Sequence, residues 1–212
     1  MTDFDTLFAG QRLMAILRGH SPEASVELAE KAWDVGISAV EVPIQTDDAV
    51  TSLRAVVAAG RRRNKLVGAG TVITREQLAA AVAAGVAFTV APGLDLELVQ
   101  AAHAHGLAHL PGIATATELQ RAALAGLGWV KVFPASVLGA DWFTIMRGPF
   151  PAMNFVATGG MSAGNAAEYL RAGVSVVAVG SALSDPVQLT KLAELMKVFT
   201  ASSAPSDRSA HP

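Results

Sequence analysis

Lys131 is an ionisable residue inside a stretch, GWVKVFPAS, that otherwise has the apolar character of a buried strand. Lysine is rarely buried fully unless another group pairs with it. Because side chains alternate across a strand, Val130 and Val132 are expected to face surrounding helices, and Trp129, Lys131 and Phe133 the opposite side. A desolvated amine disfavours its charged form, and the free base can attack a ketone to give a Schiff base. The alternatives are a lysine paired with a buried carboxylate for structure, or one that reaches solvent at the strand end.

Glu41 holds the equivalent position in a second stretch, AVEVPIQT. Glu41, Pro43 and Gln45 alternate there with three apolar residues, so they are expected to face the same interior as Lys131. Schiff-base chemistry needs a group that moves protons between hydroxyl, water and carbon, and a desolvated carboxyl group suits this. The alternative is that Glu41 only neutralises the lysine.

Two further expected strands end in polar residues that can bind a substrate. Arg18 ends AILRG, where a planar guanidinium can hold a carboxylate or a phosphate through two hydrogen bonds. A surface ion pair is the alternative for this arginine. Thr71 in GAGTV offers a hydroxyl beside glycines that let a ligand approach the backbone, although such glycines also occur where a barrel is tightly packed.

Two glycine-rich turns, ATGGM and VGSAL, follow the last two expected strands. In a barrel of strands and helices, these two turns often bind phosphate through exposed backbone N–H groups and the start of a short helix. Either turn alone is explained by ordinary turn formation, but the pair predicts a phosphate cradle. Its candidate residues are Thr158, Gly159, Gly160, Gly180 and Ser181.

Other residues give little support for metal or nucleotide chemistry. His103 and His105 are two positions apart on an expected helix and do not share a face. Asp47 and Asp48 follow an expected strand at the place where helix caps occur, so we expect them to cap a helix. The sequence has neither a GxGxxG nor a Walker A motif. We therefore expect no metal ion and no cofactor.

The composition restricts the partners and the location. The chain has 212 residues, no cysteine, 51% hydrophobic residues and a net charge of −2. Nucleic acid and anionic membranes favour a clustered basic surface, whereas the one basic run here, Arg61 to Arg63, is expected at a solvated helix end. The first residues lack the basic segment of a secretion signal, and no run of about 18 apolar residues occurs. We expect a cytoplasmic protein that binds a small molecule, with no nucleic acid or membrane partner.

The residues above need elements that bring them to one place, and the sequence supplies a repeat. Short β-rich runs recur about every 20 to 25 residues, and segments with an apolar helical stripe follow them. Four of these segments, SPEASVELAEKAWDVG, TREQLAAAVAAG, TATELQRAALAG and SAGNAAEYLRAG, begin with Ser or Thr as N-caps and end with Gly. The expected strands cover 12–18, 39–44, 65–72, 87–92, 108–113, 129–135, 154–160 and 176–181.

Eight strands that alternate with helices over about 200 residues predict one α/β domain, a (β/α)8 TIM barrel, rather than an open doubly wound sheet. In such a barrel, catalytic groups gather at the carboxyl ends of the strands. We expect the barrel to occupy residues 1–200. The polar ending ASSAPSDRSAHP predicts a disordered tail at residues 201–212.

Together, these segments make the chain similar to the class I aldolases of the 2-keto-3-deoxy-6-phosphogluconate family. This family includes the 2-keto-3-deoxy-6-phosphogalactonate and 4-hydroxy-2-oxoglutarate aldolases. The resemblance runs from Arg12 to Phe199, in the family's order and spacing. The segments that carry it are AILRG, VEVPIQT, GAGTV, APG, LPGIATATE, VKVFPAS, GPFP, ATGGM and VGSAL.

The resemblance implies a role for each candidate residue. Lys131 would form the Schiff base and Glu41 would transfer protons. The other implied substrate contacts are Arg18 and Thr71 at the keto acid, Pro92 and Phe133 on the pocket wall, and Gly160, Gly180 and Ser181 at the phosphate or distal end. The resemblance also implies a homotrimer. Gln45 departs from the family, since some phosphogluconate members carry arginine there, and this leaves the preferred sugar acid open.

The expected reaction is cleavage of a 2-keto-3-deoxy-6-phospho sugar acid, gluconate or galactonate, to pyruvate and glyceraldehyde 3-phosphate. One alternative is cleavage of 4-hydroxy-2-oxoglutarate to pyruvate and glyoxylate. A second is a sugar-phosphate isomerase or epimerase that uses Glu41 as a base without a covalent step. A third is a phosphate-binding sensor, for which two inward ionisable groups would be costly to bury.

Overall fold

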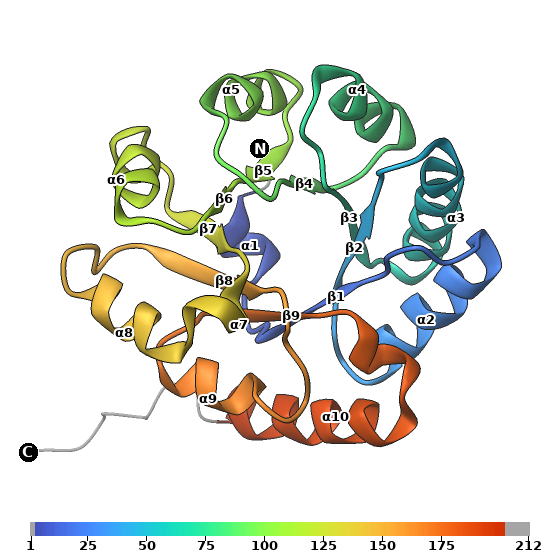
Figure 1. The fold of residues 1–212 in the computed structure, drawn as a ribbon. Helices are drawn as coiled ribbons and strands as arrows, with labels where there is room; N and C mark the ends of the chain where they lie inside the picture. The colour runs from blue at the N-terminus through green and yellow to red at the C-terminus, as the bar shows by residue number, and fades with distance from the viewer. Residues whose placement is uncertain (1–2, 202–212) are drawn as a thin grey trace, which may run out of the picture.

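The computed structural model describes residues 3–201 as a ring of parallel strands enclosed by helices (Figure 1). The strands are β1 (Leu13–Ile16), β2 (Ala39–Pro43), β3 (Leu66–Gly70), β4 (Phe88–Val90), β5 (Ala108–Leu110), β6 (Gly112–Ile113), β7 (Trp129–Val132), β8 (Asn154–Thr158) and β9 (Val176–Val179). The helices are α1 (Phe4–Leu7), α2 (Pro22–Asp34), α3 (Asp47–Arg63), α4 (Arg75–Ala84), α5 (Leu96–Ala104), α6 (Ala116–Leu124), α7 (Ala135–Leu138), α8 (Ala140–Arg147), α9 (Ala166–Arg171), the 3-10 helix η1 (Ser181–Ser184) and α10 (Pro186–Ala201).

The strands follow the order β5-β4-β3-β2-β1-β9-β8-β7-β6, and every pairing is parallel. The two ends of this order, β5 and β6, are consecutive in the chain and are separated only by Pro111. The sheet therefore closes almost completely, and the (β/α)8 barrel is confirmed. The prediction of one unbroken strand at 108–113 was wrong, because Pro111 has no N–H to donate and divides it between two neighbours.

The predicted strand alternation is also confirmed. Val130 and Val132 of β7 belong to the apolar layer between sheet and helices, as do Val40 and Val42 of β2. A second apolar cluster fills the inside of the barrel and includes Met14, Phe88, Val90, Leu110 and Val156. Lys131 and Glu41 alternate with the helix-facing valines and are 2% and 0% exposed, so both point into the barrel.

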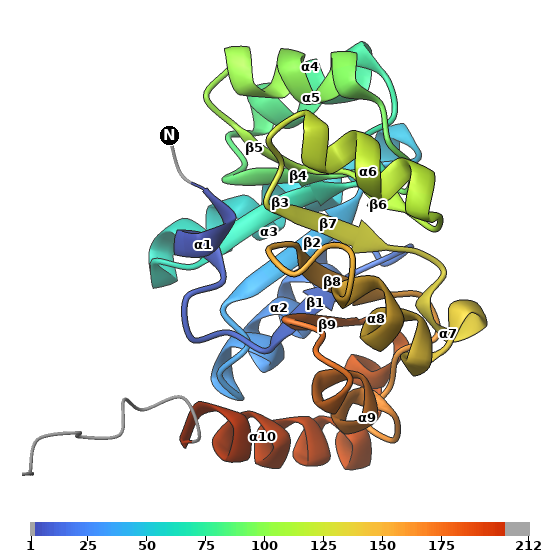
Figure 2. The same ribbon diagram turned by 90° about the vertical axis from the view of Figure 1, so that its left-hand side faces the viewer.

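Helix α1 closes the amino end of the barrel, and the sequence did not predict it. Phe4, Leu7 and Phe8 join the interior cluster. The Phe8 ring lies 5.2 Å from that of Trp129 and 6.5 Å from that of Phe88, centroid to centroid. Figure 2 shows α1 at the opposite end of the barrel from α7, which follows a strand's carboxyl end. Because α1 closes the amino end, solvent can reach the interior only from the carboxyl ends of the strands.

Helix ends follow the predicted chemistry with two corrections. Ser21, Thr74 and Thr115 cap α2, α4 and α6 through their side chains. Thr46 caps α3, so the predicted capping by Asp47 and Asp48 was wrong; both lie in the first turn, where a negative charge is favourable. The predicted cap at Ser162, the start of SAGNAAEYLRAG, was wrong too, since Asn165, three residues later, holds the N-cap position of α9.

Further predictions concern the surface and the C-terminal end of the chain. The basic run at 61–63 is exposed at the end of α3, as predicted. Residues 202–212 of the predicted tail lie outside the described residues, while Ala201 ends α10. No helix in the described part of the chain is long and apolar enough to cross a membrane.

Candidate active site

Lys131 lies near the carboxyl end of β7, inside the barrel. Its neighbours in register are Gly112 of β6 and Val156 of β8, so a residue without a side chain stands on one flank. The Nζ atom lies 5.3 Å from the centroid of the Phe133 ring, which is 37% exposed at the mouth. The amine thus lies between the apolar interior and the Phe133 ring, which lines a cavity that Lys131 itself does not line.

Glu41 stands on β2, fully buried, and neither carboxylate oxygen has a hydrogen-bond partner within the described residues. No ion pair within 4 Å joins it to Lys131 in that part of the chain. A buried carboxylate without a partner costs several kcal/mol, roughly, and calls for a bound water, ligand or proton to explain it. Simple neutralisation of the lysine by a close ion pair, the structural alternative, is not observed.

The glycines of β3 make room for this carboxylate. A Cβ atom on Gly70 would overlap Oε1 of Glu41, and one on Gly68 would overlap the Phe88 ring. The sequence left two explanations for these glycines, approach of a ligand to the backbone and tight packing of the barrel. The structure supports tight packing, because side chains of the neighbouring strands fill the space that the glycines leave.

Thr71 comes directly after β3 and has a φ of +56°. A β-branched residue rarely adopts this left-handed conformation, which stores backbone strain of about 1–3 kcal/mol. Such strain persists where the surroundings fix it, often at functional sites. Pro92 lies two residues past the end of β4 and is half-buried.

Arg18 lies two residues beyond β1, and its side chain is exposed at the mouth. One guanidinium nitrogen, Nη1, donates a hydrogen bond of 2.8 Å to Oε1 of Gln45. Gln45 lies two residues past β2, so the neutral amide orients the arginine without cancelling its charge. The positive charge stays available to an anionic group of a ligand, and the surface ion pair considered from the sequence is not found among the described residues.

The predicted phosphate cradle lines one cavity of about 810 Å³ at this end of the barrel. Gly159 and Gly160 have φ values of +94° and +75°, which only glycine adopts easily. Thr158 is 4% exposed, and its hydroxyl has no partner in the described part of the structure. The full lining is Ile16, Arg18, His20, Phe133, Thr158, Gly159, Gly160, Met161, Ser162, Ala178, Gly180, Ser181 and Ser184.

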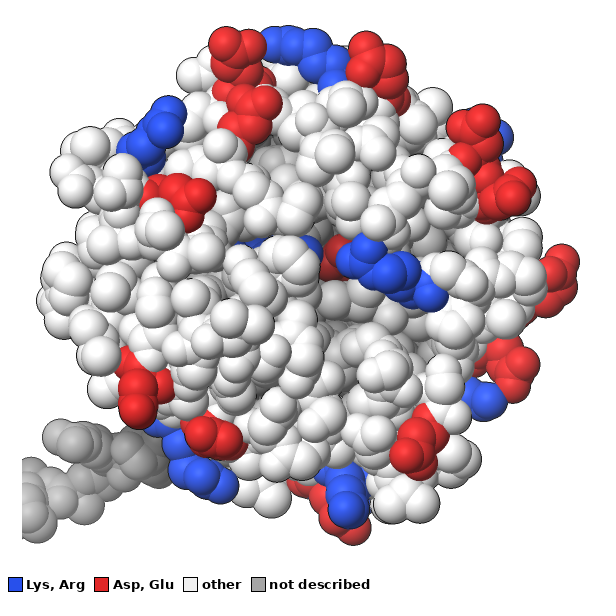
Figure 3. All heavy atoms as spheres, viewed as in Figure 1, with Lys and Arg blue, Asp and Glu red and all other residues white. Residues whose placement is uncertain are grey.

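The cavity brings together most of the predicted binding residues but not all. Thr71 and Pro92 lie at the ends of other strands and are not part of its lining. His20 and Ser184 also line the cavity, although neither was predicted to do so. They lie two and three residues past the expected strands 12–18 and 176–181, and this position was the available signal. Figure 3, the view onto the carboxyl ends, shows a central hollow with charged atoms of both signs inside a largely uncharged surface.

The contact of Ser136 with the turn after β8 was also not predicted from the sequence. A Cβ atom on Gly160 would overlap its hydroxyl, and its backbone N–H donates to the carbonyl of Gly159 at 3.1 Å. The turn after β8 therefore rests against α7, which follows the strand that carries Lys131. This contact ties the geometry of the two glycines to the lysine strand.

Within residues 3–201, no group of three or more His, Cys, Asp or Glu side chains could hold a metal ion. His109, which begins an expected strand, faces the helices and not the cavity. Its Nδ1 lies 2.9 Å from Oγ1 of Thr89, and burial lowers its pKa from 6.5 to about 4. This histidine belongs to the packing and not to the site.

The comparison with known proteins decides the family. The family model KDPG and KHG aldolase matches residues 5–200. The chain belongs to this family. The family resemblance inferred from AILRG, VKVFPAS and the other segments is therefore confirmed, and aldolases of this family are carbon–carbon lyases.

Individual relatives agree with the family. The chain is 37% identical to the 2-dehydro-3-deoxy-phosphogluconate aldolase of Treponema pallidum, over 84% of this chain and 83% of that one. It is 34% identical to a probable 2-dehydro-3-deoxy-6-phosphogalactonate aldolase of Rhizobium meliloti, over 82% of each. A crystal structure of KDPG aldolase from Legionella pneumophila, with pyruvate captured as a covalent carbinolamine intermediate, superposes with a TM-score of 0.79 at 29% identity. That match covers 96% of this chain and 99% of the other.

Proposed function

We propose that this chain is a class I aldolase that cleaves a 2-keto-3-deoxy-6-phospho sugar acid to pyruvate and glyceraldehyde 3-phosphate. The observation that carries the proposal is a buried lysine inside the same barrel as a buried glutamate whose carboxylate has no partner among the described residues. An ion pair would tie both groups up, whereas these two are left available for chemistry. The relatives named for phosphogluconate and phosphogalactonate substrates support the substrate class.

In the first half of the reaction, the neutral amine of Lys131 attacks the C2 ketone to give a carbinolamine. Loss of water from it leaves an iminium ion. Glu41 takes the proton of the C4 hydroxyl as the C3–C4 bond breaks, and the bonding electrons move into the iminium. The aldehyde product leaves, and the pyruvate enamine stays on the lysine.

In the second half, Glu41 returns its proton to C3 of the enamine, and water then hydrolyses the iminium to release pyruvate. A carboxyl group that is alternately base and acid must have oxygens free of fixed donors. The absence of hydrogen-bond partners on both oxygens within the described residues supports this assignment. A bound water between Glu41 and the substrate can relay the proton if the two do not touch.

The substrate lies along the mouth of the barrel in this proposal. Arg18 and Thr71 hold the carboxylate end of the keto acid, with Pro92 and Phe133 as the wall beside it. The phosphate lies at the turns after β8 and β9. The residues proposed there are Thr158, Gly159, Gly160, Gly180 and Ser181. Binding of this remote group assists the chemistry at C2 and C3.

The substrate assignment is tested by kcat/KM for 2-keto-3-deoxy-6-phosphogluconate, its galactonate epimer and 4-hydroxy-2-oxoglutarate. We expect a phosphorylated substrate to lead, and the leading epimer identifies the sugar acid that Gln45 left open. Ser181→Asp should penalise both phosphorylated substrates far more than 4-hydroxy-2-oxoglutarate, since like charges repel at a close anion site. If the unphosphorylated substrate leads in the wild type, the glyoxylate-forming reaction is the better assignment.

Two finer expectations, a homotrimer and a cytoplasmic location, are part of the proposal. Exposed apolar side chains on consecutive helices, Val137 of α7 (78%) and Ile145 of α8 (63%), support assembly through this side of the barrel. Sedimentation velocity is the measurement for the trimer. We expect three copies per particle, fewer after Ile145→Asp, and a wild-type monomer would contradict the proposal.

A further inference from the structure

The cavity next to the active site is lined by one arginine and one histidine and by no carboxylate. Of its lining side chains, Arg18 and His20 are the ionisable ones, and the remaining polar groups are hydroxyls of Thr158 and three serines. A cavity of about 810 Å³ with this lining favours an anion. Arg18 is turned toward Gln45 by its hydrogen bond, so His20, the other ionisable side chain of the wall, needs an explanation of its own.

The backbone at His20 is fixed by two helices. Its carbonyl accepts hydrogen bonds from the hydroxyls of Ser52 on α3, at 3.0 Å, and of Ser25 on α2, at 3.4 Å. The residue itself is exposed and directly precedes Ser21, the N-cap of α2. The backbone of His20 is therefore held at the edge of the cavity, and its exposed side chain is part of the lining.

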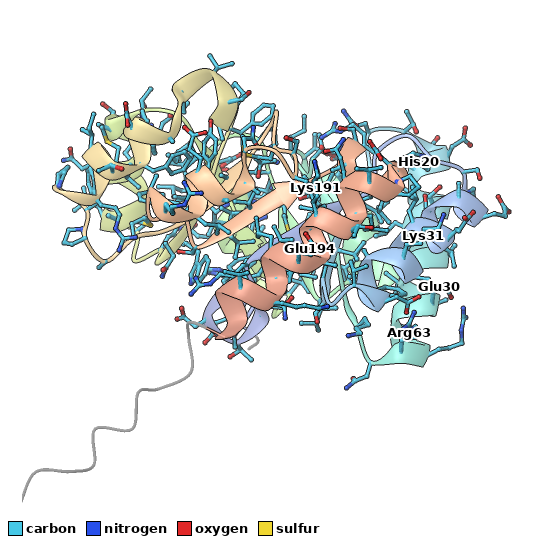
Figure 4. All side chains as sticks on the ribbon, turned by 90° about the horizontal axis from the view of Figure 1, so that it is seen from below. His20, Glu30, Lys31, Arg63, Lys191 and Glu194 are labelled. Carbon is cyan, nitrogen blue, oxygen red and sulfur yellow. The ribbon has the colours of Figure 1, made fainter. Side chains whose placement is uncertain are left out.

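The position of His20 puts it beside the phosphate end of the site. Strands β1 and β9 pair with each other, so the turn that carries His20 adjoins the turn that carries Ser181 and Ser184. Helix α2 also packs against η1. Figure 4 shows His20 at the end of the molecule where α10 begins, whereas Arg63 marks the opposite end of the neighbouring helices.

Other charges near His20 do not face the same cavity. Asp48 and His20 both line an adjoining cavity of about 450 Å³, and Glu23 of α2 accepts a hydrogen bond from the Ser21 hydroxyl. Imidazole carries an N–H donor whether it is neutral or protonated. Donation into the carboxylate-free cavity therefore does not depend on the charge state of the ring.

We propose that His20 is a specificity-determining residue of this aldolase, which donates a hydrogen bond to the substrate's phosphate from the β1 side while Ser181 and Ser184 act from the β9 side. This rests on the proposed function. It adds a side chain to a phosphate site that is otherwise built from glycine turns and hydroxyls. The consequence is selectivity, since an unphosphorylated substrate of the same carbon skeleton leaves this donor unused.

The test compares wild type, His20→Asn and His20→Lys on 2-keto-3-deoxy-6-phosphogluconate and on 2-keto-3-deoxygluconate, which lacks the phosphate. We expect His20→Asn to lower the ratio of the two kcat/KM values by about tenfold, the scale of one hydrogen bond to a charged group. His20→Lys, which places an N–H donor at the same position, should restore most of that ratio. Inorganic phosphate should inhibit His20→Asn about tenfold more weakly than wild type.

His105→Asn is the matched control, because His105 is exposed at the end of α5 and lies outside the cavity lining. It should keep the wild-type ratio. The proposal is overturned if His20→Asn keeps that ratio, if both substrates lose activity equally, or if His20→Lys behaves like His20→Asn. A wild-type enzyme that does not form a borohydride-trapped pyruvate adduct would instead refute the proposed function, which separates the two failures.

Discussion

The burial of His109 predicts how the free energy of unfolding of the barrel changes at acid pH. It is 2% exposed between β5 and the outer helices, with Nδ1 bonded to Thr89 and Nε2 without a partner among the described residues. Its pKa falls to about 4, chiefly because burial disfavours the charged ring; the nearby His103 adds to this, and Asp95 opposes it. In the unfolded chain the same ring titrates near 6.5.

The sign follows from which state binds the proton more tightly. Below pH 6.5 the unfolded chain takes up a proton that the folded protein refuses until about pH 4, so the stability is complete above the first value and falls toward the second. Each unit by which the pKa differs between the folded and the unfolded state corresponds to about 1.36 kcal/mol. The free energy of unfolding should therefore fall by about 2.5 kcal/mol between about pH 7.5 and about pH 4.5.

Urea unfolding of wild type and His109→Asn at these two pH values is the assay. Asparagine can keep a polar atom near Thr89 but cannot titrate, so the variant should lose about 2.5 kcal/mol less than wild type on acidification. Its neutral-pH stability is lower for packing reasons, which leaves the difference between the two pH values unaffected. His105→Asn, on an exposed histidine, should keep the full acid loss. Equal acid losses in wild type and His109→Asn would refute the reasoning.

Three other predictions concern the site and the barrel floor. Glu41→Gln should still form the Schiff base but cleave about 10²-fold more slowly or worse, measured by single-turnover kinetics; wild-type turnover would show that another group moves the protons. Gly70→Ala should slow cleavage by a similar factor, about 10²-fold, because the new Cβ displaces the Glu41 carboxylate, whereas Gly128→Ala, which meets no atom within 4 Å, should not. Phe8→Ala should lower the free energy of unfolding by about 3 kcal/mol in urea titrations, because it empties the contact with Trp129; a loss below about 1 kcal/mol would show that α1 does not close the barrel.

Strand alternation predicted the inward orientation of the two central residues. Val130 and Val132 flank Lys131 in the sequence. If the two valines pack against the helices, the lysine side chain points to the opposite face of the strand, whichever strands pair with it. The orientations of Lys131 and Glu41 are confirmed for that reason. Their catalytic roles stay predictions, since burial and parity do not show a reaction.

The parts that sequence missed depend on contacts between distant segments. Pro111 divides a strand because its two halves pair with different neighbours, β4 and β7. Helix α1 has four residues, which is too short for an apolar pattern of helical period. The aromatic side chains in and after it stabilise the fold only through their contacts with Phe88 and Trp129. His20 lies in a turn after β1, where no periodic pattern shows which way a side chain points.

The most direct test of the central claim is borohydride reduction in the presence of pyruvate, followed by peptide mass mapping. We predict one covalent adduct, on Lys131, because its amine is held beside Phe133 inside the barrel, where the buried carboxylate of Glu41 also has no partner among the described residues. Lys65 and Lys191 serve as internal controls and should stay unmodified. An unmodified Lys131, or an adduct on either of the other lysines instead, would contradict the account.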